Sequence, residues 1–336
     1  MRVAMLSPIA WRTPPRSYGP WEKVVSVLTE GLISAGVDVT LFATADSLTD
    51  AKLDAVCPAP YEEDSTIDPK VWECLHISNL MEKAEDFDII HNHFDFLPLS
   101  YSALIDTPMV TTIHGFSSKK IIPVYKKYNS ETHYISISDA DRHPDIDYLD
   151  TIYHGIRSDD FTYSDIKEDY LLFYGRIHPH KGTHTAIEIA EKCGKPLFIA
   201  GLVQDQNYYS KEIAPHIDGT NVKYLGNLSQ EEGNNVLGRA RALLHPIHFE
   251  EPFGLSVAEA MMCGTPVIAN SRGSMPELIK DGKTGFLVNS VDEAVAAVQK
   301  IEQIDMTYCR THAIENFSVW RMVETYIGIY SKILVN

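Results

Sequence analysis

The sequence contains little cysteine, no long apolar run and no excess of basic residues. Its five cysteines lack any C-x-x-C pair, which disfavours a metal site and predicts reduced core thiols in a cytoplasmic protein; they are Cys57, Cys74, Cys193, Cys263 and Cys309. No run of 18 apolar residues is present, so no membrane-spanning helix is expected. Residues 1–8 lack the long apolar stretch of a signal peptide and are typical of a first strand.

Acidic residues outnumber basic ones, and the formal net charge is −17. Binding to nucleic acid is therefore not expected, because the phosphate backbone attracts a basic surface. Affinity for anionic membranes is disfavoured for the same reason. One exception is a lysine cluster formed by Lys119, Lys120, Lys126 and Lys127. It has two interpretations: a solvated surface, which is the commoner case, or a site that captures an anionic acceptor or a lipid headgroup.

Apolar residues make up 44% of the chain, and its length suits two domains of about 150 residues each. Short apolar runs alternate with helical patterns, which is typical of strands covered on both faces. The expected strands cover residues 3–7, 37–44, 88–91, 108–114, 133–138, 151–154, 170–174, 196–201, 222–226, 242–245, 266–269 and 285–288. Helices are expected at 21–35, 183–192 and 291–304, the first two followed by Gly36 and Gly194 as C-caps. This pattern predicts two doubly wound α/β domains.

The domain boundary is expected within residues 155–168, where strand signals lapse and Ser-Asp turns appear. We therefore place the first domain at residues 1–157 and the second at 158–318. In open parallel sheets, ligands bind beyond the carboxyl ends of the strands. Two such domains facing each other would form one cleft, with a donor on one wall and an acceptor on the other.

The most informative motif is EEPFGLSVAEAMMCG at residues 250–264. A helix is expected at about residues 255–263, with a glycine that permits close backbone approach at its start. An anion resting on this N-terminus would meet the amides of Phe253, Gly254 and Leu255. Glu251 and Glu259 flank that position, and carboxylates accept hydrogen bonds from sugar hydroxyls. As an isolated pair, two such glutamates are more often surface residues around a helix cap.

The second motif, GRIHPHKG, covers residues 175–182 and follows an expected strand. Arg176 and Lys181 are therefore expected at the carboxyl end of that strand. Two fixed cations there could hold a diphosphate and stabilise the charge that builds on it as a leaving group. Nothing marks His178 and His180 as metal ligands, and we interpret them as loop residues.

Two weaker signals lie in the first half of the chain. The loop PPRSYGPWE at residues 14–22 ends where a helix begins, with Pro20 suited to the first helical position and Gly19 able to approach a ligand. His114 ends another expected strand. A lone histidine is more often structural than functional, and the same ambiguity applies to His91 and His93.

Together these segments resemble the family-4 glycosyltransferases, which are retaining enzymes of the GT-B fold. The resemblance extends over essentially the whole chain and also includes the TTIHG, ISIS and IYHGI segments and the stretch PELIKDGKTGFLV at 276–288. It implies two Rossmann-like domains facing across a cleft. It further implies that a final helix, here within residues 319–336, crosses back onto the N-terminal domain.

The resemblance implies donor roles for the matching residues of the second domain. Arg176 and Lys181 would grip the diphosphate, Glu251 would bind hydroxyls of the transferred sugar and Glu259 would bind the ribose. The amides of residues 253–255 would contact the sugar and phosphates.

The resemblance also assigns residues of the first domain. His114 would lie near the sugar C6 hydroxyl and the acceptor, and Gly19 near the diphosphate. His93, Lys119 and Lys120 are further candidates for the acceptor side. Many relatives carry Gly-Gly where this chain has Gly19-Pro20, and Asn-Gly where it has His154-Gly155. Since proline removes a backbone N–H, these departures concern the acceptor side and leave the donor motifs intact.

The implied reaction is hexosyl transfer to an acceptor hydroxyl with retention, in which the leaving diphosphate itself accepts the acceptor proton. Because two cations would stabilise the leaving diphosphate, we expect metal-independent catalysis and no cofactor besides the nucleotide sugar as co-substrate. We expect a UDP-sugar first and GDP-mannose next, while the acceptor stays open among saccharides, small molecules and lipid-linked compounds. The alternative is a non-catalytic nucleotide-sugar-binding protein. A nicotinamide-dependent oxidoreductase is disfavoured, because no G-x-G-x-x-G follows an expected strand.

Overall fold

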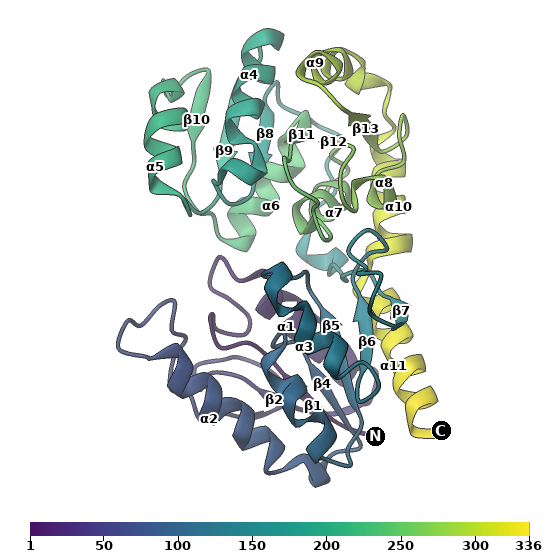
Figure 1. Ribbon diagram of the computed structural model, residues 1–336. Coiled ribbons are helices and arrows are strands. Elements are labelled where there is room, and N and C mark those ends of the chain that lie inside the picture. Colours follow the sequence, from purple (N-terminus) through teal and green to yellow (C-terminus); the bar gives the residue numbers. More distant parts are fainter. Residues whose placement is uncertain (336) are drawn as a thin grey trace. The chain divides into compact units, whose positions relative to one another are not determined.

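The computed structural model describes residues 1–335, which divide into two compact units (Figure 1). Unit 1 comprises Met1–Gly155 and the C-terminal segment from Val319, and unit 2 comprises Ile156–Ser318. Each unit is built on a parallel sheet, as the alternation of strands and helices predicts. The last helix, α11 (Val319–Val335), belongs to unit 1 although unit 2 precedes it in the chain. No helix within residues 1–335 is long and apolar enough to cross a membrane.

The sheet of unit 1 has seven parallel strands in the order β3-β2-β1-β4-β5-β6-β7. Their bounds, in that order, are Lys52–Asp54, Asp38–Phe42, Arg2–Leu6, Ile89–Asn92, Met109–Ile113, His133–Ser136 and Tyr148–Thr151. Register pairs Leu6 with Phe42 on one side and with Asn92 on the other. The direction of winding reverses between β1 and β4, and doubly wound sheets commonly bind ligands at such a switch point.

Alternating side chains of these strands fill the space on the two faces of the sheet. On one face, Ala4 and Leu6 belong to a buried cluster that also includes Leu80 of α2 (Pro69–Met81) and Tyr125 of α3 (Ile122–Lys127). On the other face, α1 (Pro20–Ser34) and α11 pack against each other. α1 presents an apolar stripe to the core, made up of Val24, Val25, Leu28 and Leu32.

The sheet of unit 2 has six parallel strands in the order β10-β9-β8-β11-β12-β13. Their bounds, in that order, are Val222–Tyr224, Leu197–Ala200, Leu171–Tyr174, Ala242–His245, Val267–Asn270 and Gly285–Val288. The helices are α4 (Thr183–Cys193), α5 (Gln206–Tyr208), α6 (Gln230–Arg239), α7 (Leu255–Met262), α8 (Met275–Leu278), α9 (Val291–Lys300) and α10 (Met306–Phe317). Here the winding reverses between β8 and β11.

Several local predictions are confirmed. Pro20 is the first residue of α1, and Gly194 ends α4 in the left-handed conformation. Others need correction. The strand expected at 151–154 is β7, which ends at Thr151, because its apolar content is low and it pairs as an edge strand with β6. Cys74 is not a core thiol, since α2 exposes it to solvent.

Candidate active site

The predicted donor residues of unit 2 lie in the loops that follow β8 and β11, the two strands at its switch point. Arg176 and Lys181 follow β8, and Glu251 follows β11. In a doubly wound sheet, the connections after the two strands at the switch point lead away in opposite directions. Ligands commonly bind between the two loops at that point. The fold therefore brings Lys181 and Glu251, from distant motifs, into contact, and places Arg176 in the same loop as Lys181.

A close backbone approach brings the two loops together at Gly182. A Cβ atom on this residue would lie 2.0 Å from the carbonyl oxygen of Pro246, and its φ of +71° is left-handed, so only glycine fits. Beside it, the amide of His248 donates to the carbonyl of His180 over 2.7 Å. Lys181 is the last residue of the short 3₁₀ turn Pro179–Lys181 and lies between His180 and Gly182. These two contacts therefore hold Lys181 against the loop after β11.

Lys181 forms a nearly buried ion pair with Glu251, in which the ammonium donates to the carboxylate. The exposed fractions of the two side chains are 15% and 10%. Nε2 of His245, at the end of β11, lies 3.4 Å from Glu251 Oε2. Burial alone would raise the pKa of Glu251, but the Lys181 charge and the contacts with His245 and Lys181 lower it to about 2. Glu251 is therefore ionised at neutral pH.

Arg176 is half-buried at the end of β8, and its guanidinium donates to the side-chain carbonyl of Gln204. Gln204 lies in the loop after β9, the next strand of the sheet. The bond restrains Arg176 without neutralising it, so its charge remains available to an anion.

The predicted helix start is present at α7. Gly254 is its N-cap with a φ of +93°, and no side chain caps the first turn, which begins at Leu255. Phe253 is buried just before it. This end of the helix carries the positive end of the helix dipole. Glu259 is buried one turn further on, near the Tyr174 hydroxyl, whose pKa is raised by burial and by that carboxylate.

The loop between β12 and α8 fixes the backbone of Glu251. The amide of Ser274 donates to the carbonyl of Glu251 over 2.9 Å, and the amide of Gly273 donates to the carboxylate of Glu250 over 2.6 Å. Gly273 has a φ of +54°, and a Cβ atom on it would lie 2.3 Å from the Glu251 nitrogen. These two hydrogen bonds fix the backbone that carries the Glu251 side chain.

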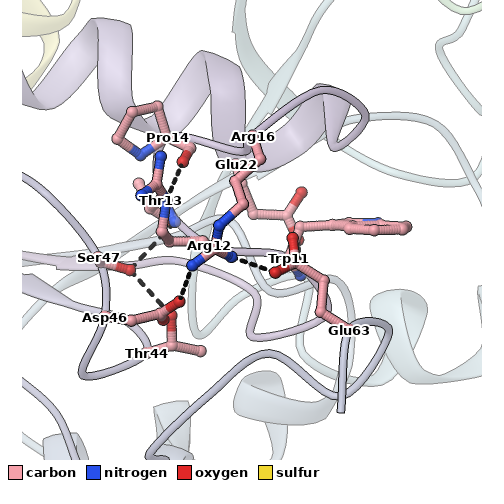
Figure 2. A network of polar contacts seen from close by, with 10 residues as sticks. All are labelled: Trp11, Arg12, Thr13, Pro14, Arg16, Glu22, Thr44, Asp46, Ser47 and Glu63. Atoms are coloured by element: carbon pink, nitrogen blue, oxygen red, sulfur yellow. Dashed lines mark hydrogen bonds and ion pairs between the residues drawn. The ribbon is translucent and has the colours of Figure 1, made fainter. Parts of the chain in front are cut away.

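In unit 1, a polar network organises the loop after β1 (Figure 2). Arg16 is bonded to two carboxylates, to Asp46 over 2.9 Å and to Glu63. The Thr13 amide donates to Ser47 Oγ over 3.0 Å, which joins this loop to the one after β2. The charge of Arg16 is therefore already compensated within unit 1.

The same loop folds back onto the start of α1. Gly19 is buried against the side chains of Trp11 and Pro15. The amide of Trp11 donates over 3.1 Å to Glu22, in the first turn of α1 (Figure 2). Burial raises the pKa of Glu22 to about 7 against the hydrogen bonds it accepts.

Four buried histidines form a cluster in unit 1: His91 and His93 at the end of β4, His114 after β5 and His154 after the edge strand β7. Nδ1 of His93 lies 2.8 Å from Nε2 of His114, and Nδ1 of His114 lies 3.3 Å from Nε2 of His154. His91 packs against His93 with ring centroids 4.0 Å apart. Both ring nitrogens of His114 are thus engaged by other histidines, and His93 is fully buried.

The lysine cluster lies on the surface of unit 1. Lys119 and Lys120 are exposed on a 3₁₀ turn, Lys119–Ile121, directly before α3. Lys126 is paired with Asp145 over 2.9 Å. Lys127 lies over the ring of Tyr128, 4.9 Å from its centroid.

Within residues 1–335, no group of three or more His, Cys, Asp and Glu side chains is arranged to hold a metal ion. Three residues of the site were not singled out from the sequence. His245 lies at the end of a strand, as His114 does. The rule that ligands bind beyond the carboxyl ends of parallel strands could therefore have found it. Gln204 and Gly273 lie in ordinary-looking loops, and only the packing of neighbouring loops gives them a role.

Two protein families match the chain. Glycosyl transferases group 1 matches residues 158–313, within unit 2, and Glycosyltransferase Family 4 matches residues 22–143, within unit 1. A glycogen synthase of Mycobacterium tuberculosis is 26% identical over an alignment of 360 residues, which covers 90% of this chain and 86% of the relative.

Solved structures share the fold. Sucrose-phosphate synthase of Thermosynechococcus elongatus superposes with a TM-score of 0.79 at 17% identity, over 100% of this chain and 99% of that one. HepE of Anabaena, in complex with UDP-glucose, gives a TM-score of 0.74 at 18% identity, over 99% and 100% of the two chains.

Proposed function

Since this chain belongs to the family-4 glycosyltransferases of the GT-B fold, we propose that its donor is a UDP-sugar. The enzyme moves a hexosyl unit from that donor to an acceptor hydroxyl and retains the anomeric configuration. Arg176, Lys181 and Glu251 carry the donor half of the reaction in unit 2.

The observation that carries this proposal is the nearly buried Lys181–Glu251 pair, which joins the loops after β8 and β11 at the switch point of unit 2. An anionic diphosphate competes with Glu251 for the Lys181 ammonium. When the phosphates bind that ammonium, the ionised Glu251 is free to accept hydrogen bonds from hydroxyl groups of the sugar. One pair thus supplies both the cation for the leaving group and the acceptor atoms for the hexose.

The α7 N-terminus supplies the rest of the donor site. Its uncapped first turn and the helix dipole favour a phosphate or a sugar oxygen at residues 253–255. Glu259, buried further along α7, binds the ribose hydroxyls. The choice of uridine is supported by HepE, a protein of the same fold that binds UDP-glucose.

In the reaction, the bond between the sugar C1 and the diphosphate oxygen breaks, and a bond forms between C1 and the acceptor oxygen. The acceptor proton passes to the departing diphosphate. Arg176, Lys181 and the helix dipole stabilise the charge that develops on the diphosphate, and no metal is required for this step. Glu251 acts through recognition of the sugar and not as a covalent nucleophile.

For the acceptor side we propose residues of unit 1: His114, which follows β5, and His93, whose ring is bonded to it. Gly19, directly before α1, is instead assigned to the diphosphate. Lys119 and Lys120 are exposed and free to meet an anionic acceptor. The acceptor class is a saccharide, a small molecule or a lipid-linked compound.

A thermal-shift screen against UDP-, GDP- and ADP-sugars tests the donor. We expect the largest rise in melting temperature with UDP-hexoses, and the rise should disappear in Arg176→Ala. A shift with GDP-mannose alone would replace uridine by guanosine. Binding without any transfer or hydrolysis would favour a non-catalytic binder, and no shift with any of them would contradict the proposal.

A further inference from the structure

The histidines of unit 1 form a directed chain, in which each ring uses a particular nitrogen. His93 contributes Nδ1, His114 contributes both of its nitrogens and His154 contributes Nε2. A neutral imidazole has one N–H donor and one bare acceptor nitrogen. A proton on one nitrogen of the chain therefore fixes the tautomer of each ring that follows.

The buried ring of His93 determines in which direction the three histidines donate their hydrogen bonds. Nε2 of His93 is buried and has no hydrogen-bond partner among the residues that the structure describes. An orphaned buried N–H is rarer and costlier than an orphaned acceptor. His93 therefore carries its proton on Nδ1 and donates it to Nε2 of His114. His114 then carries its own proton on Nδ1 and donates to Nε2 of His154.

The rings around this chain leave it little freedom to move. His91, packed against His93, is bonded through Nδ1 to the Tyr330 hydroxyl of α11 over 2.6 Å and through Nε2 to Thr112 over 2.8 Å. On the far side, the indole of Trp21, in the first turn of α1, stacks on His114 with centroids 5.4 Å apart. The His114 ring is thus held in one plane from three directions.

We propose that His93 and His154 are positioning residues, which lock His114 as the neutral Nδ1–H tautomer in one ring plane. This role rests on the proposed function, because His114 is the ring that unit 1 presents to the acceptor side. With both nitrogens engaged, His114 serves as a rigid wall of the site and does not carry a proton during transfer. Burial and the neighbouring imidazoles keep the pKa of His93 and His114 well below the usual range, which agrees with a neutral chain.

Amide substitutions test the chain, because an amide reproduces one ring nitrogen but not the other. Asparagine places its amide where Nδ1 of a histidine lies, and glutamine reaches the position of Nε2. His93→Asn and His154→Gln should therefore keep kcat within about 3-fold of the wild type. His93→Gln and His154→Asn should lower kcat by about 10-fold or more, since they misplace the His114 ring.

The pattern across the four variants decides the matter. If asparagine and glutamine are equally harmful at each position, the two histidines only fill space and the proposal is wrong. Equal, unchanged activity in all four would also overturn it. Melting temperatures identify any variant that fails to fold.

A second measurement needs no activity. In the wild type labelled with ¹⁵N-histidine, the resonances of His114 can be assigned by their loss in His114→Gln. We expect a protonated Nδ1 and a bare Nε2. The opposite tautomer, or a charged ring, would refute the chain as described. If the tautomer is found but the protein transfers no sugar, the proposed function fails and the positioning chain stands as a structural feature.

Discussion

Lys181 donates a hydrogen bond to Glu251, and both side chains are nearly buried although 70 positions separate them. The two residues come from different motifs and meet because β8 and β11 are neighbours at the point where the sheet of unit 2 reverses its winding. A cation and an anion that neutralise each other in the free protein can each be released to a part of a nucleotide sugar. A preorganised pair of this kind is what the proposed donor site requires.

Replacing either cation of the donor site should abolish most of the activity. We expect Lys181→Ala and Arg176→Ala each to lower turnover by roughly 100-fold or more, because each removes a charge that stabilises the leaving diphosphate. Steady-state transfer kinetics measure this. Lys192→Ala, on the exposed surface of α4, is the matched control and should retain full turnover. Full activity in both site variants would exclude the diphosphate assignment.

The Lys181–Glu251 pair also predicts a pH dependence of stability. The folded-state pKa of Glu251, about 2, lies below its unfolded value, so its contribution is present above the unfolded pKa and is lost as pH falls towards 2. Lys181→Met leaves a buried carboxylate without its cation and should lower the free energy of unfolding by about 3 to 5 kcal/mol at pH 7.

Burial then dominates in Lys181→Met and raises the pKa of Glu251. The variant should therefore recover part of its lost stability between pH 7 and pH 5, as Glu251 takes up a proton. Urea denaturation of both proteins at several pH values measures the difference. A deficit that stays constant over this range would show that the pair is not electrostatically coupled.

Glu22, in unit 1, should make the free energy of unfolding depend on pH in the opposite sense. Its pKa is raised to about 7 in the folded state, so its stabilising contribution is complete below the unfolded pKa and is lost as pH rises through 7. Glu22→Gln keeps an acceptor for the Trp11 amide and cannot ionise. We expect it to match the wild type near pH 5 and to exceed it at pH 8 by up to about 3 kcal/mol. Chemical denaturation at the two pH values checks this, and a difference independent of pH would contradict it.

Gly273 supports Glu251 through its lack of a side chain. In Gly273→Ala the new Cβ would lie 2.3 Å from the Glu251 nitrogen, so the backbone of Glu251 must move. A displacement of about 1 Å at such a site can cost about 100-fold in kcat. Gly282→Ala is the matched control, because Gly282 also has a positive φ but no atom within 4 Å of the added Cβ. Comparable kcat values for the two variants would show that Gly273 does not support Glu251.

The sequence predicts much of the fold, because its strands are continuous apolar runs that need two covered faces. The short edge strand β3 escaped prediction, since three half-exposed residues carry no such pattern. Helix α2 was also not singled out, although it begins at a clear Asp68 cap. Its apolar residues are mixed with polar ones on both faces, so its periodicity is weak.

For the site, the sequence predicts which residues end strands but not which of them touch. Arg176, Lys181 and Glu251 were identified by their motifs. The contact between Lys181 and Glu251 depends on strand order, and a single sequence does not encode that order locally. The histidines show the same limit. His91, His93 and His114 each follow from the strand-end rule, whereas their hydrogen bonds depend on the register between β4 and β5.

We propose that this chain activates a nucleotide-diphosphate sugar through Arg176 and Lys181. The release of UDP from UDP-hexoses by the purified protein without an acceptor, followed over hours by a coupled assay, measures this activation. We expect slow release from at least one UDP-hexose, and no release by the Arg176→Ala/Lys181→Ala double variant. Equal release by the wild type and the double variant, or no release from any nucleotide sugar even with acceptor sugars added, would contradict it.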